Sequence, residues 1–519
     1  MGFRRLIVGS TQHLRLTALG STLLAMSCSP GNSARTNANG GADGVAGNAG
    51  FNPVSTGGQS NPFNVDPDAS TTGRPKTGLC GTLGNLACNI RDCGAQSKTT
   101  VTAKVYDPAG KNPLYNVVAY VPNEAVSPIA TGATCETCNT PVSGKPIASA
   151  LTNAQGEFTM QDVPVGTNVP LVLQIGKWRR QIVLPEVKAC QANVFDDPNL
   201  FRLPRNQAEG NIPKIAIAAG DADRLQCLFR RIGVDASEFT NPDGAGAINI
   251  YNQPSDPDKG GGYDNGTVYP QAVPLWEDLS QMMKYDIVML ACAGVNSATN
   301  PFNSSNYITP AAKNVMVQYV NGGGRVMAEH YHWAWIRTFT DDKLPPVASP
   351  FGEVASWIEP ISTSAIGTTI NTRIETSFPK GQAMADWLLA VGATPTAGTL
   401  MLTGEVKPTA LDVTPPNPTV SQRWIYEPGT GTSALRTHYF SFNAPIANAP
   451  EQQCGRFVYT GLHVTTSDTT KADSKTKFPS CCQIRDLLPQ EKALEFMVFD
   501  LSSCVLPPDV TQQPPPTIN

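Results

Sequence analysis

Short apolar runs alternate with amphipathic helical segments over the second half of the chain, and this alternation restricts the fold more than any other feature. Residues 214–219 form an apolar run, and residues 225–232 carry apolar side chains at helical spacing. Residues 285–292 and 325–330 are further apolar runs, and residues 309–321 between them have a helical pattern. Strands that alternate with helices in this way predict a parallel sheet covered on both faces.

The ends of these segments carry the residues that start and stop helices. Thr309 suits the cap and Pro310 the first turn of a helix that ends at the glycines 322–324. Residues 456–460 predict another strand, and residues 489–501 predict a helix with one apolar face. We therefore expect an α/β domain that continues almost to the end of the chain.

Three segments do not fit the alternation. Residues 244–270 are rich in Gly, Asn and Asp and are expected to form a surface loop. Residues 340–450 are rich in Pro and Thr with short β-like runs, which predicts a β-rich insertion. The Pro-rich tail, residues 506–519, is expected to be disordered.

Residues 99–205 have the pattern of an antiparallel β-sandwich. Apolar and polar residues alternate over residues 101–105, and residues 107–110 provide a turn. The motif T-N-x-x-G-x-F at residues 152–158, followed by V-P-x-G at residues 163–166, resembles the carboxypeptidase regulatory-like, prealbumin-type domain. This resemblance implies an accessory module that carries no catalytic residues.

A second resemblance covers residues 206–505. The segments Y-D-I-V-M-L (residues 285–290), Y-V-N-G-G-G-R-V-M-A-E-H (residues 319–330) and G-R-F-V-Y-T-G-L-H (residues 455–463) resemble the ThuA-like relatives of the class I glutamine-amidotransferase fold. The resemblance implies a flavodoxin-like parallel sheet. Because one fold hosts many functions, it does not by itself imply an activity. The expected protein is thus multidomain.

The first 27 residues have the pattern of a signal peptide, with arginines ahead of an apolar stretch that is too short to span a bilayer. This stretch ends at Cys28 in a sequence that resembles a bacterial lipobox, which predicts a lipid-modified cysteine. Ser29, rather than an aspartate, follows the cysteine, and by analogy with lipoprotein sorting in two-membrane bacteria this favours delivery to the outer membrane. The alternative is an ordinary cleaved signal peptide with an incidental cysteine. Residues 28–78 are rich in small polar residues and predict a disordered tether.

Twelve of the 13 cysteines remain when Cys28 is set aside, and an even number in an exported chain favours disulfides. The Cys-rich segment 79–98 predicts a local disulfide staple rather than a metal site. The C-x-x-C at residues 135–138 predicts a disulfide within one loop. Cys227 and Cys292 lie in apolar runs, where buried thiols are an equally good interpretation.

The charge balance sets limits on partners. The formal net charge is −4, without a basic field that would attract nucleic acid. We expect the membrane, through the lipid anchor, and an envelope protein or a glycan as partners.

Several polar residues are expected to gather at the carboxyl ends of the parallel strands, where ligands bind in open α/β sheets. The predicted cleft contains Asp221, Glu329, His330, His332 and His463. The three histidines are candidate ligands for a divalent metal. The alternatives are a cleft that binds a small molecule without metal, and hydrogen-bonded loop residues that form no site.

Cys292 follows a predicted strand, where an amidotransferase places its nucleophile. That chemistry needs a tight strand-to-helix turn, but the glycine two residues before the cysteine is missing and residues 295–305 show no helical stripe. Two hypotheses follow for the whole protein. The first is a non-catalytic envelope lipoprotein that acts as a binding or structural module. The alternative is a ThuA-like enzyme or sugar-handling protein that uses the histidine-lined cleft.

Overall fold

The computed structural model of this chain describes residues 74–75, 85–220, 223–253, 261–292, 308–337, 339–341, 344–347, 349, 351–352, 354–357, 369–403, 410–413, 420–429, 435–462 and 477–518. Cys28, Asp221 and His463 lie outside these ranges, as do the predicted signal peptide and nearly all of the predicted tether.

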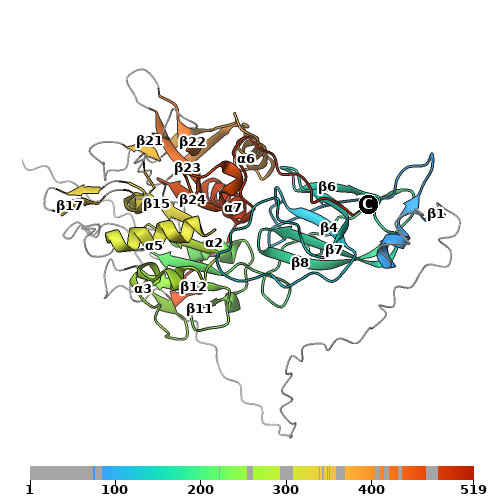
Figure 1. The fold of residues 1–519 in the computed structure, drawn as a ribbon, viewed down its shortest axis with the longest axis horizontal. Coiled ribbons are helices and arrows are strands. Elements are labelled where there is room, and N and C mark those ends of the chain that lie inside the picture. Colours follow the sequence, from blue (N-terminus) through green and yellow to red (C-terminus); the bar gives the residue numbers. More distant parts are fainter. Residues whose placement is uncertain are drawn as a thin grey trace, which may run out of the picture. The chain divides into compact units, whose positions relative to one another are not determined.

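Two sheets that share one hydrophobic core form the first part of the described structure, which we call the β module (Figure 1). One sheet has the strand order β6-β3-β9 and the other β5-β4-β7-β8. Their bounds are β3 Thr100–Lys104, β4 Val118–Pro122, β5 Pro146–Leu151, β6 Glu157–Gln161, β7 Gly166–Ile175, β8 Trp178–Val187 and β9 Ala192–Val194. The alternation expected for residues 101–105 is present, since Val101 and Ala103 are buried and their neighbours in β3 are not.

The second part, the mixed-sheet module, is built on a 12-stranded sheet within the described residues. Its central strands run parallel in the order β12-β10-β14-β15-β24. Numbered along the chain, this is the order 2-1-3-4-5 of flavodoxin-like folds. The bounds are β10 Ile215–Ala219, β12 Ile248–Asn252, β14 Ile287–Leu290, β15 Arg325–Glu329 and β24 Gly455–Thr460, and β11 Phe239–Thr240 pairs with β12 at the edge.

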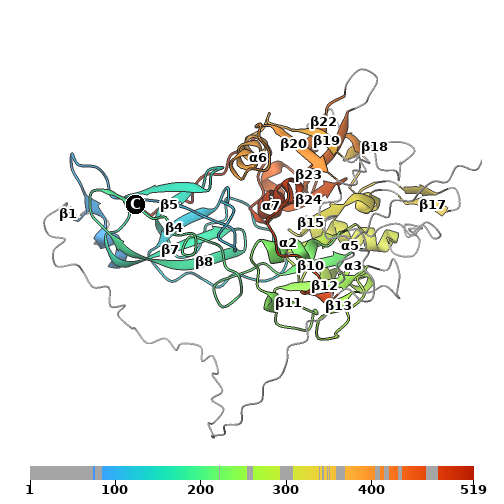
Figure 2. The same cartoon turned by 180° about the vertical axis from the view of Figure 1, so that it is seen from behind.

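Helices cover both faces of the parallel strands, as the alternation of strands and helices predicts. In β10, Ile215 and Ile217 face one core and Ala216 and Ala218 face another. The first core includes α2, α6 and α7, and the second includes α3, α4 and α5 (Figure 2). The bounds are α2 Leu225–Arg231, α3 Val273–Glu277, α4 Leu279–Met282, α5 Pro310–Asn321, α6 Pro379–Ala390 and α7 Pro489–Ser502.

The helix signals in the sequence are confirmed at α5. The Thr309 hydroxyl accepts a hydrogen bond from the backbone N–H of Ala312 at 3.1 Å, and Pro310 is the first helical residue. Short 3-10 turns add to these helices at η2 Asn85–Asn89, η3 Ala236–Glu238, η4 His330–Trp335 and η5 Pro450–Gln452. Within the described ranges, no helix is both long and apolar enough to cross a membrane.

The β-rich insertion is part of the main sheet. From β24 the sheet continues antiparallel through β23, β22, β19 and β20, with β18 and β21 attached at one side. The bounds are β18 Ala355–Trp357, β19 Thr369–Ile374, β20 Thr399–Thr403, β21 Ala410–Val413, β22 Ser421–Glu427 and β23 Arg436–Ala444. Three two-stranded ribbons complete the described strands: β1 Arg74–Pro75 with β2 Arg91–Asp92, β13 Gly262–Tyr263 with β25 Lys477–Phe478, and β16 Phe339–Asp341 with β17 Leu344–Val347.

The expectation of a surface loop over residues 244–270 is partly wrong. Residues 248–252 form β12, whose five residues are all buried and pair with β10 in parallel register. The surrounding Gly and Asn residues favour turns locally. This preference is outweighed because β12 gains a ladder of hydrogen bonds with β10 and buries Ile248 and Ile250.

The two modules belong to one compact unit and share core residues. The ring of Trp178 in β8 lies 5.8 Å from that of Phe499 in α7, and Tyr115 stacks on Phe496 at the same distance. Gly176 lies in the turn between β7 and β8, where a Cβ atom would lie 1.7 Å from the backbone oxygen of Ser502. This close approach requires glycine.

Disulfides also join the modules. Cys135 bonds Cys454 and Cys138 bonds Cys504, so the prediction of a disulfide within the 135–138 loop is wrong. The sequence separations are 319 and 366 residues, which no local pattern reveals. The local staple expected in the Cys-rich segment is also wrong for Cys93, which bonds Cys190.

The C-terminal segment, for which the sequence predicts disorder, contacts the β module over its described residues. It runs back along the β module, and Figure 1 marks the C-terminus beside those strands. The Ser149 hydroxyl donates to the backbone oxygen of Pro515 at 2.6 Å, and the Asn116 amide donates to the Gln512 side chain at 2.8 Å. A proline-rich segment is compatible with this arrangement, because an extended proline-rich chain needs no internal hydrogen bonds.

Candidate functional site

The parallel strands bring a cysteine, a histidine and a glutamate together at one place. The winding of the sheet reverses between β10 and β14, and the carboxyl ends of strands at such a point are where open α/β sheets bind ligands. Cys292 follows β14, and Glu329 and His330 stand at the end of the neighbouring β15. We call Cys292, Glu329 and His330 the switch-point cluster.

Cys292 contacts both other members of the cluster, His330 through its side chain and Glu329 through its backbone. Cys292 Sγ lies 3.3 Å from His330 Nδ1, and the backbone N–H of Cys292 donates to Glu329 Oε2 at 3.1 Å. The backbone of His330 has φ +39°, a left-handed conformation that is uncommon outside glycine. The Tyr459 hydroxyl from β24 donates to the His330 backbone oxygen at 2.7 Å and helps to hold this conformation.

The backbone of β10 approaches the cluster closely. A Cβ atom on Gly220 would lie 1.9 Å from the backbone oxygen of Cys292, so only glycine fits there. Gln253, at the end of β12, donates to the backbone oxygens of both Ala218 and Ala291 at 2.8 and 2.5 Å. These contacts fix the strand ends around Cys292.

His332 has a positioning role in this structure. Its Nε2 donates to the Ala291 backbone oxygen at 3.0 Å, and its Nδ1 accepts from the Trp335 indole at 3.1 Å. Burial lowers the pKa of His332 to about 4, so the ring is neutral at pH 7. Because both ring nitrogens are engaged, His332 offers no lone pair to a metal ion in this arrangement.

The sequence prediction is thus met only in part at this edge of the sheet. Glu329 and His330 converge, and His332 lies beside them with its ring turned to Ala291. Asp221 and His463 lie outside the described residues, so their part in the expected cleft stays a prediction. All three members of the switch-point cluster are fully buried, which makes it an interior group and not an open cleft.

Sequence reasoning identified Cys292 but missed its contact with His330. The signal was available, because both residues follow neighbouring parallel strands, whose carboxyl ends meet at one edge of the sheet. The pairing of β14 with β15, from Ile287 with Arg325 to Leu290 with Ala328, is what places them side by side.

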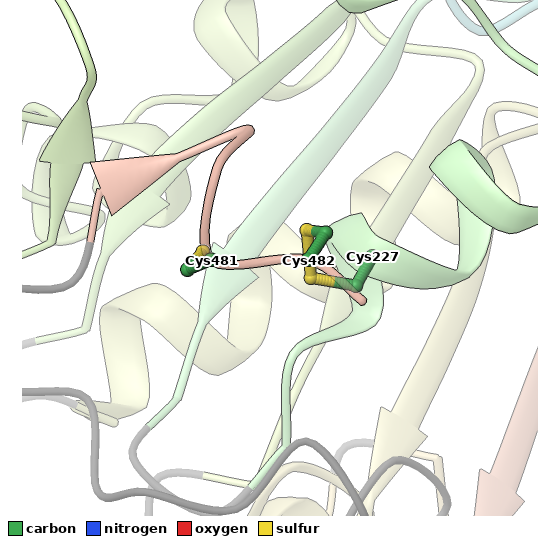
Figure 3. A group of neighbouring side chains, drawn as sticks. All are labelled: Cys227, Cys481 and Cys482. Atoms are coloured by element: carbon green, nitrogen blue, oxygen red, sulfur yellow. A yellow bond between two sulfur atoms is a disulfide. The ribbon is translucent and has the colours of Figure 1, made fainter. Parts of the chain in front are cut away.

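Within the described part of the chain, one group of three side chains has the mutual distances of metal ligands. The sulfurs of Cys227, Cys481 and Cys482 lie within 4.8 Å of one another (Figure 3). Cys227 and Cys482 are joined by a disulfide with an S–S distance of 2.00 Å. Metals bind thiolates, so this group does not fit a metal ion while the disulfide is formed.

A second candidate site is a cavity of about 680 Å³ between the two modules. From the β module its walls include the loop of residues 127–130 and 133–134, residues 136–143, and residues 174–177 at the end of β7. From the mixed-sheet module they include Asp286, Arg325 and residues 502–504, and the C-terminal segment adds residues 510–516. The volume lies in the range of small-molecule sites.

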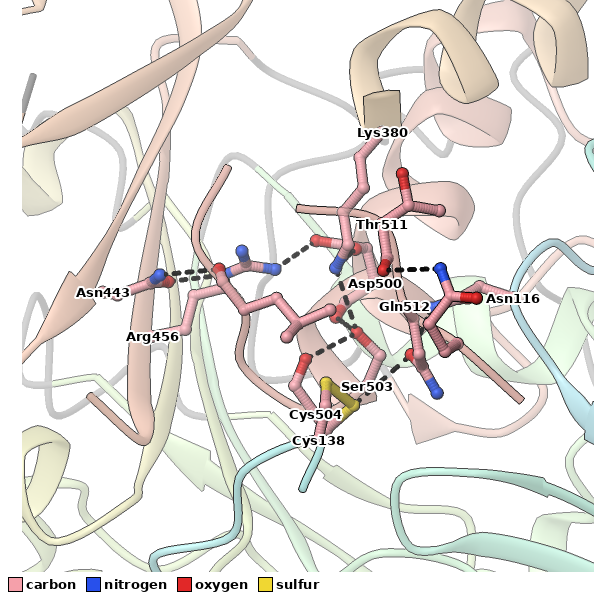
Figure 4. Close-up of a disulfide and its surroundings, with 12 residues drawn as sticks. Asn116, Cys138, Lys380, Asn443, Arg456, Asp500, Ser503, Cys504, Thr511 and Gln512 are labelled. Atoms are coloured by element: carbon pink, nitrogen blue, oxygen red, sulfur yellow. Dashed lines mark hydrogen bonds and ion pairs between the residues drawn. A yellow bond between two sulfur atoms is a disulfide. The ribbon is translucent and has the colours of Figure 1, made fainter. Parts of the chain in front are cut away.

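The walls of this cavity are rich in hydroxyl and amide side chains. They include Asn116, Ser143, Gln174, Ser503, Thr511 and Gln512. Figure 4 shows how Asn116, Gln512 and the Cys138–Cys504 disulfide meet beside the end of α7. Sequence reasoning missed this cavity because it depends on how two modules pack together.

Comparisons with known proteins add little to these two sites. No family model matches the chain, and no curated protein matches it. Two solved structures match weakly, and both are titled as interface mutants of a type II cohesin-X-dockerin complex from Acetivibrio cellulolyticus. They are 14% and 13% identical, cover 28% and 26% of this chain and 75% and 85% of their own, and have TM-scores of 0.14 and 0.15. Scores this low support no conclusion about fold or function.

Proposed function

We propose that this protein is an exported, lipid-anchored binding protein of the bacterial cell envelope that takes a small polar ligand, most simply a glycan fragment, into the cavity between its two modules. The observation that carries the proposal is the cavity of about 680 Å³ with its hydroxyl and amide lining. Such groups form the hydrogen bonds by which polar ligands are oriented.

The cysteine chemistry supports the proposed location. Four disulfides join described cysteines, and Cys88 is disulfide-bonded as well. Disulfides persist in oxidising compartments outside the cytoplasm. Export through the signal peptide of residues 1–27, acylation at Cys28 and sorting to the outer membrane are parts of this proposal.

We also propose that the β module is of the carboxypeptidase regulatory-like type and the mixed-sheet module of the ThuA-like type. The T-N-x-x-G-x-F motif leads into β6, and the two sheets of the β module share one core. The 2-1-3-4-5 order of the parallel strands supports the second assignment. In this view the β module supplies a wall of the binding site in addition to its accessory role.

The test uses the full chain isolated from its native membranes. Mass spectrometry is expected to find an N-terminal peptide that begins at an acylated Cys28, and a Cys28→Ala variant is expected to lose the acyl groups. The lipoprotein in detergent is then applied to a glycan array beside a Thr140→Trp variant, in which an exposed residue at the cavity wall becomes large. Binding that Thr140→Trp abolishes supports the proposal. A blank array, or binding that the variant leaves unchanged, contradicts it.

A thiol-dependent activity is the second candidate function, because Cys292 Sγ lies 3.3 Å from His330 Nδ1 at the switch point of the sheet. An imidazole at this distance can take the thiol proton and so produce a nucleophilic thiolate. Iodoacetamide labelling of the native protein, followed by peptide mass spectrometry, tests it. If Cys292 reacts only after denaturation, the cluster is structural and this second candidate is excluded.

A further inference from the structure

One wall of the cavity carries a buried arginine whose hydrogen-bonding capacity is not used up by the protein. Arg325 begins β15, lines the cavity and is 8% exposed. Its Nη1 has no hydrogen-bond partner among the described residues. Burial, assisted by the nearby Arg456, lowers the pKa of Arg325 to about 10, so the guanidinium still carries its charge at pH 7.

The groups behind Arg325 do not neutralise it. Lys380 Nζ and Arg456 Nη1 both bind the carboxylate of Asp500, each at 2.6 Å (Figure 4). This carboxylate is therefore shared by two buried cations, and Arg325 is a third positive charge in the same region. A buried excess of positive charge is unfavourable unless an anion compensates it.

The other charged residues around the cavity do not remove this excess of positive charge. Lys177 and Asp286 form an ion pair of 2.7 Å, so their charges cancel. Glu136 attracts Arg325 electrostatically and offsets one positive charge, and its Oε1 accepts a hydrogen bond from the Thr134 hydroxyl at 2.8 Å. Arg179 is a further cation of the wall, and its Nε has no hydrogen-bond partner among the described residues. The walls thus carry three cations and two carboxylates.

Hydrogen-bond acceptors and donors for a neutral part of a ligand lie near these cations. The Gln174 Oε1 is buried and has no hydrogen-bond partner among the described residues, and it can accept from a hydroxyl group. The hydroxyl groups of Ser143 and Ser503 line the same cavity. The cavity therefore offers charge for an anion and polar groups for a hydroxylated body.

We propose that the ligand of this cavity is an acidic sugar whose carboxylate binds Arg325 and whose hydroxyl groups bind the surrounding hydroxyl and amide side chains. This inference rests on the proposed binding function and names the class of its ligand. The carboxylate accepts charge-assisted hydrogen bonds from the guanidinium, which are the strong kind in a desolvated site. An acidic sugar also compensates the charge that the protein leaves unbalanced.

The experiment measures binding to the full-length lipoprotein in detergent by isothermal titration calorimetry. The probes are galacturonate and glucuronate, with galactose and glucose as neutral counterparts and sodium sulfate as a simple anion. The variants are Arg325→Gln and a matched control, Arg205→Gln, which removes an arginine that is 46% exposed and pairs with Glu209 outside the cavity. We expect a hexuronate to bind, Arg325→Gln to weaken it about ten- to hundredfold, and Arg205→Gln to leave it unchanged.

The outcomes separate this inference from the proposed function. Binding of neutral sugars that is equal in the wild type and in Arg325→Gln retains the binding function and overturns the acidic ligand. Binding of sulfate without any hexuronate also overturns it. If none of the five probes binds, the ligand class proposed here is overturned and the array decides the binding function separately. Circular dichroism verifies that Arg325→Gln is folded. If it is not, Thr140→Trp replaces it, and hexuronate binding that survives this blocking substitution overturns the inference.

Discussion

The substitution Asp500→Asn tests whether the buried charges of α7 hold the mixed-sheet module together. The carboxylate of Asp500 is 3% exposed and binds Lys380 Nζ and Arg456 Nη1 at 2.6 Å each. The two cations are 5% and 4% exposed. They come from α6 and from β24, so this one carboxylate connects three elements that lie far apart in the sequence.

Asparagine keeps the shape of the side chain and removes its charge. Two cations then remain buried without a counter-charge, and one of them faces the amide NH2 instead of an oxygen. Removal of one partner from a buried ion pair destabilises proteins by about 3 to 5 kcal/mol. We expect a loss of this size in the free energy of unfolding, measured by urea denaturation at pH 7 under oxidising conditions.

The matched control is Asp486→Asn. Asp486 binds Lys111 Nζ at 2.7 Å, but its side chain is 86% exposed, so water replaces the lost contact. The same chemical change there is expected to leave the urea midpoint unchanged within error. Equal urea midpoints for the two variants would refute the reasoning, because they would show that the buried cluster of Asp500, Lys380 and Arg456 does not stabilise the folded state.

The pH dependence supplies an independent measure of the same cluster. Burial alone raises the pKa of Asp500, but Lys380 and Arg456 outweigh it and hold the pKa below its ordinary value. A carboxyl group with a lowered pKa stabilises the folded state above the pKa of the unfolded state and loses this contribution as the pH falls. The difference between wild type and Asp500→Asn should therefore narrow as the pH falls below about 4.

Three further predictions concern the interface and one helix. Burial raises the pKa of Asp107 to about 7, and burial together with the nearby Asp107 carboxyl raises the pKa of Glu495. The pair therefore stabilises the folded state most below about pH 4 and loses this contribution as the pH rises towards 7. Asp107→Asn should flatten the dependence of the free energy of unfolding on pH in this range, measured by urea denaturation, and an unchanged slope would contradict the prediction. Cys138→Ser combined with Cys504→Ser should lower the free energy of unfolding by about 2 to 5 kcal/mol in the same assay. Thr309→Ala should lower it by about 1 kcal/mol through loss of the helix cap, whereas no change would show that the cap is dispensable.

Local signals were sufficient for the helices α2, α5 and α7 and for four of the five central parallel strands of the mixed-sheet module, but the helices α3, α4 and α6 were not predicted. The helix α5 was predicted from its cap, its first proline and the glycines that end it, because these residues act on backbone groups within one turn. The strands β10, β14, β15 and β24 were predicted from short apolar runs, which strands buried on both faces require.

Elements that depend on distant partners were predicted less well. The strand β12 is short and flanked by turn-forming residues, and it exists because β10 offers an open edge for parallel pairing. The segment containing β19 to β23 was expected to be a β-rich insertion, and the sequence did not indicate that β23 pairs with β24 and extends the main sheet. Which edge a strand joins is a tertiary property that composition and periodicity do not encode.

The candidate sites show the same division. Glu329 and His330 were placed at a strand end by the rule for open α/β sheets, and the structure adds Cys292 as the residue they contact. The burial of the group was not foreseeable, because burial at a strand end is a tertiary property that local periodicity does not encode. The cavity around Arg325 had no sequence signal at all, since its walls come from several segments that are distant from one another in the chain.

The disulfides connect the proposed location of the protein to its proposed function. Residues 127–143 supply one wall of the cavity, yet apart from an isolated bridge at Thr137 they contain no strand or helix that would fix their conformation. Cys135 and Cys138 attach this segment to Cys454 and Cys504 in the other module. A site whose walls are held in place before binding loses less conformational entropy when the ligand arrives. In the proposed function, reduction of these two bonds would release the wall and weaken ligand binding without altering a ligand-binding side chain, so the proposed site depends on the oxidising compartment that we propose for the protein.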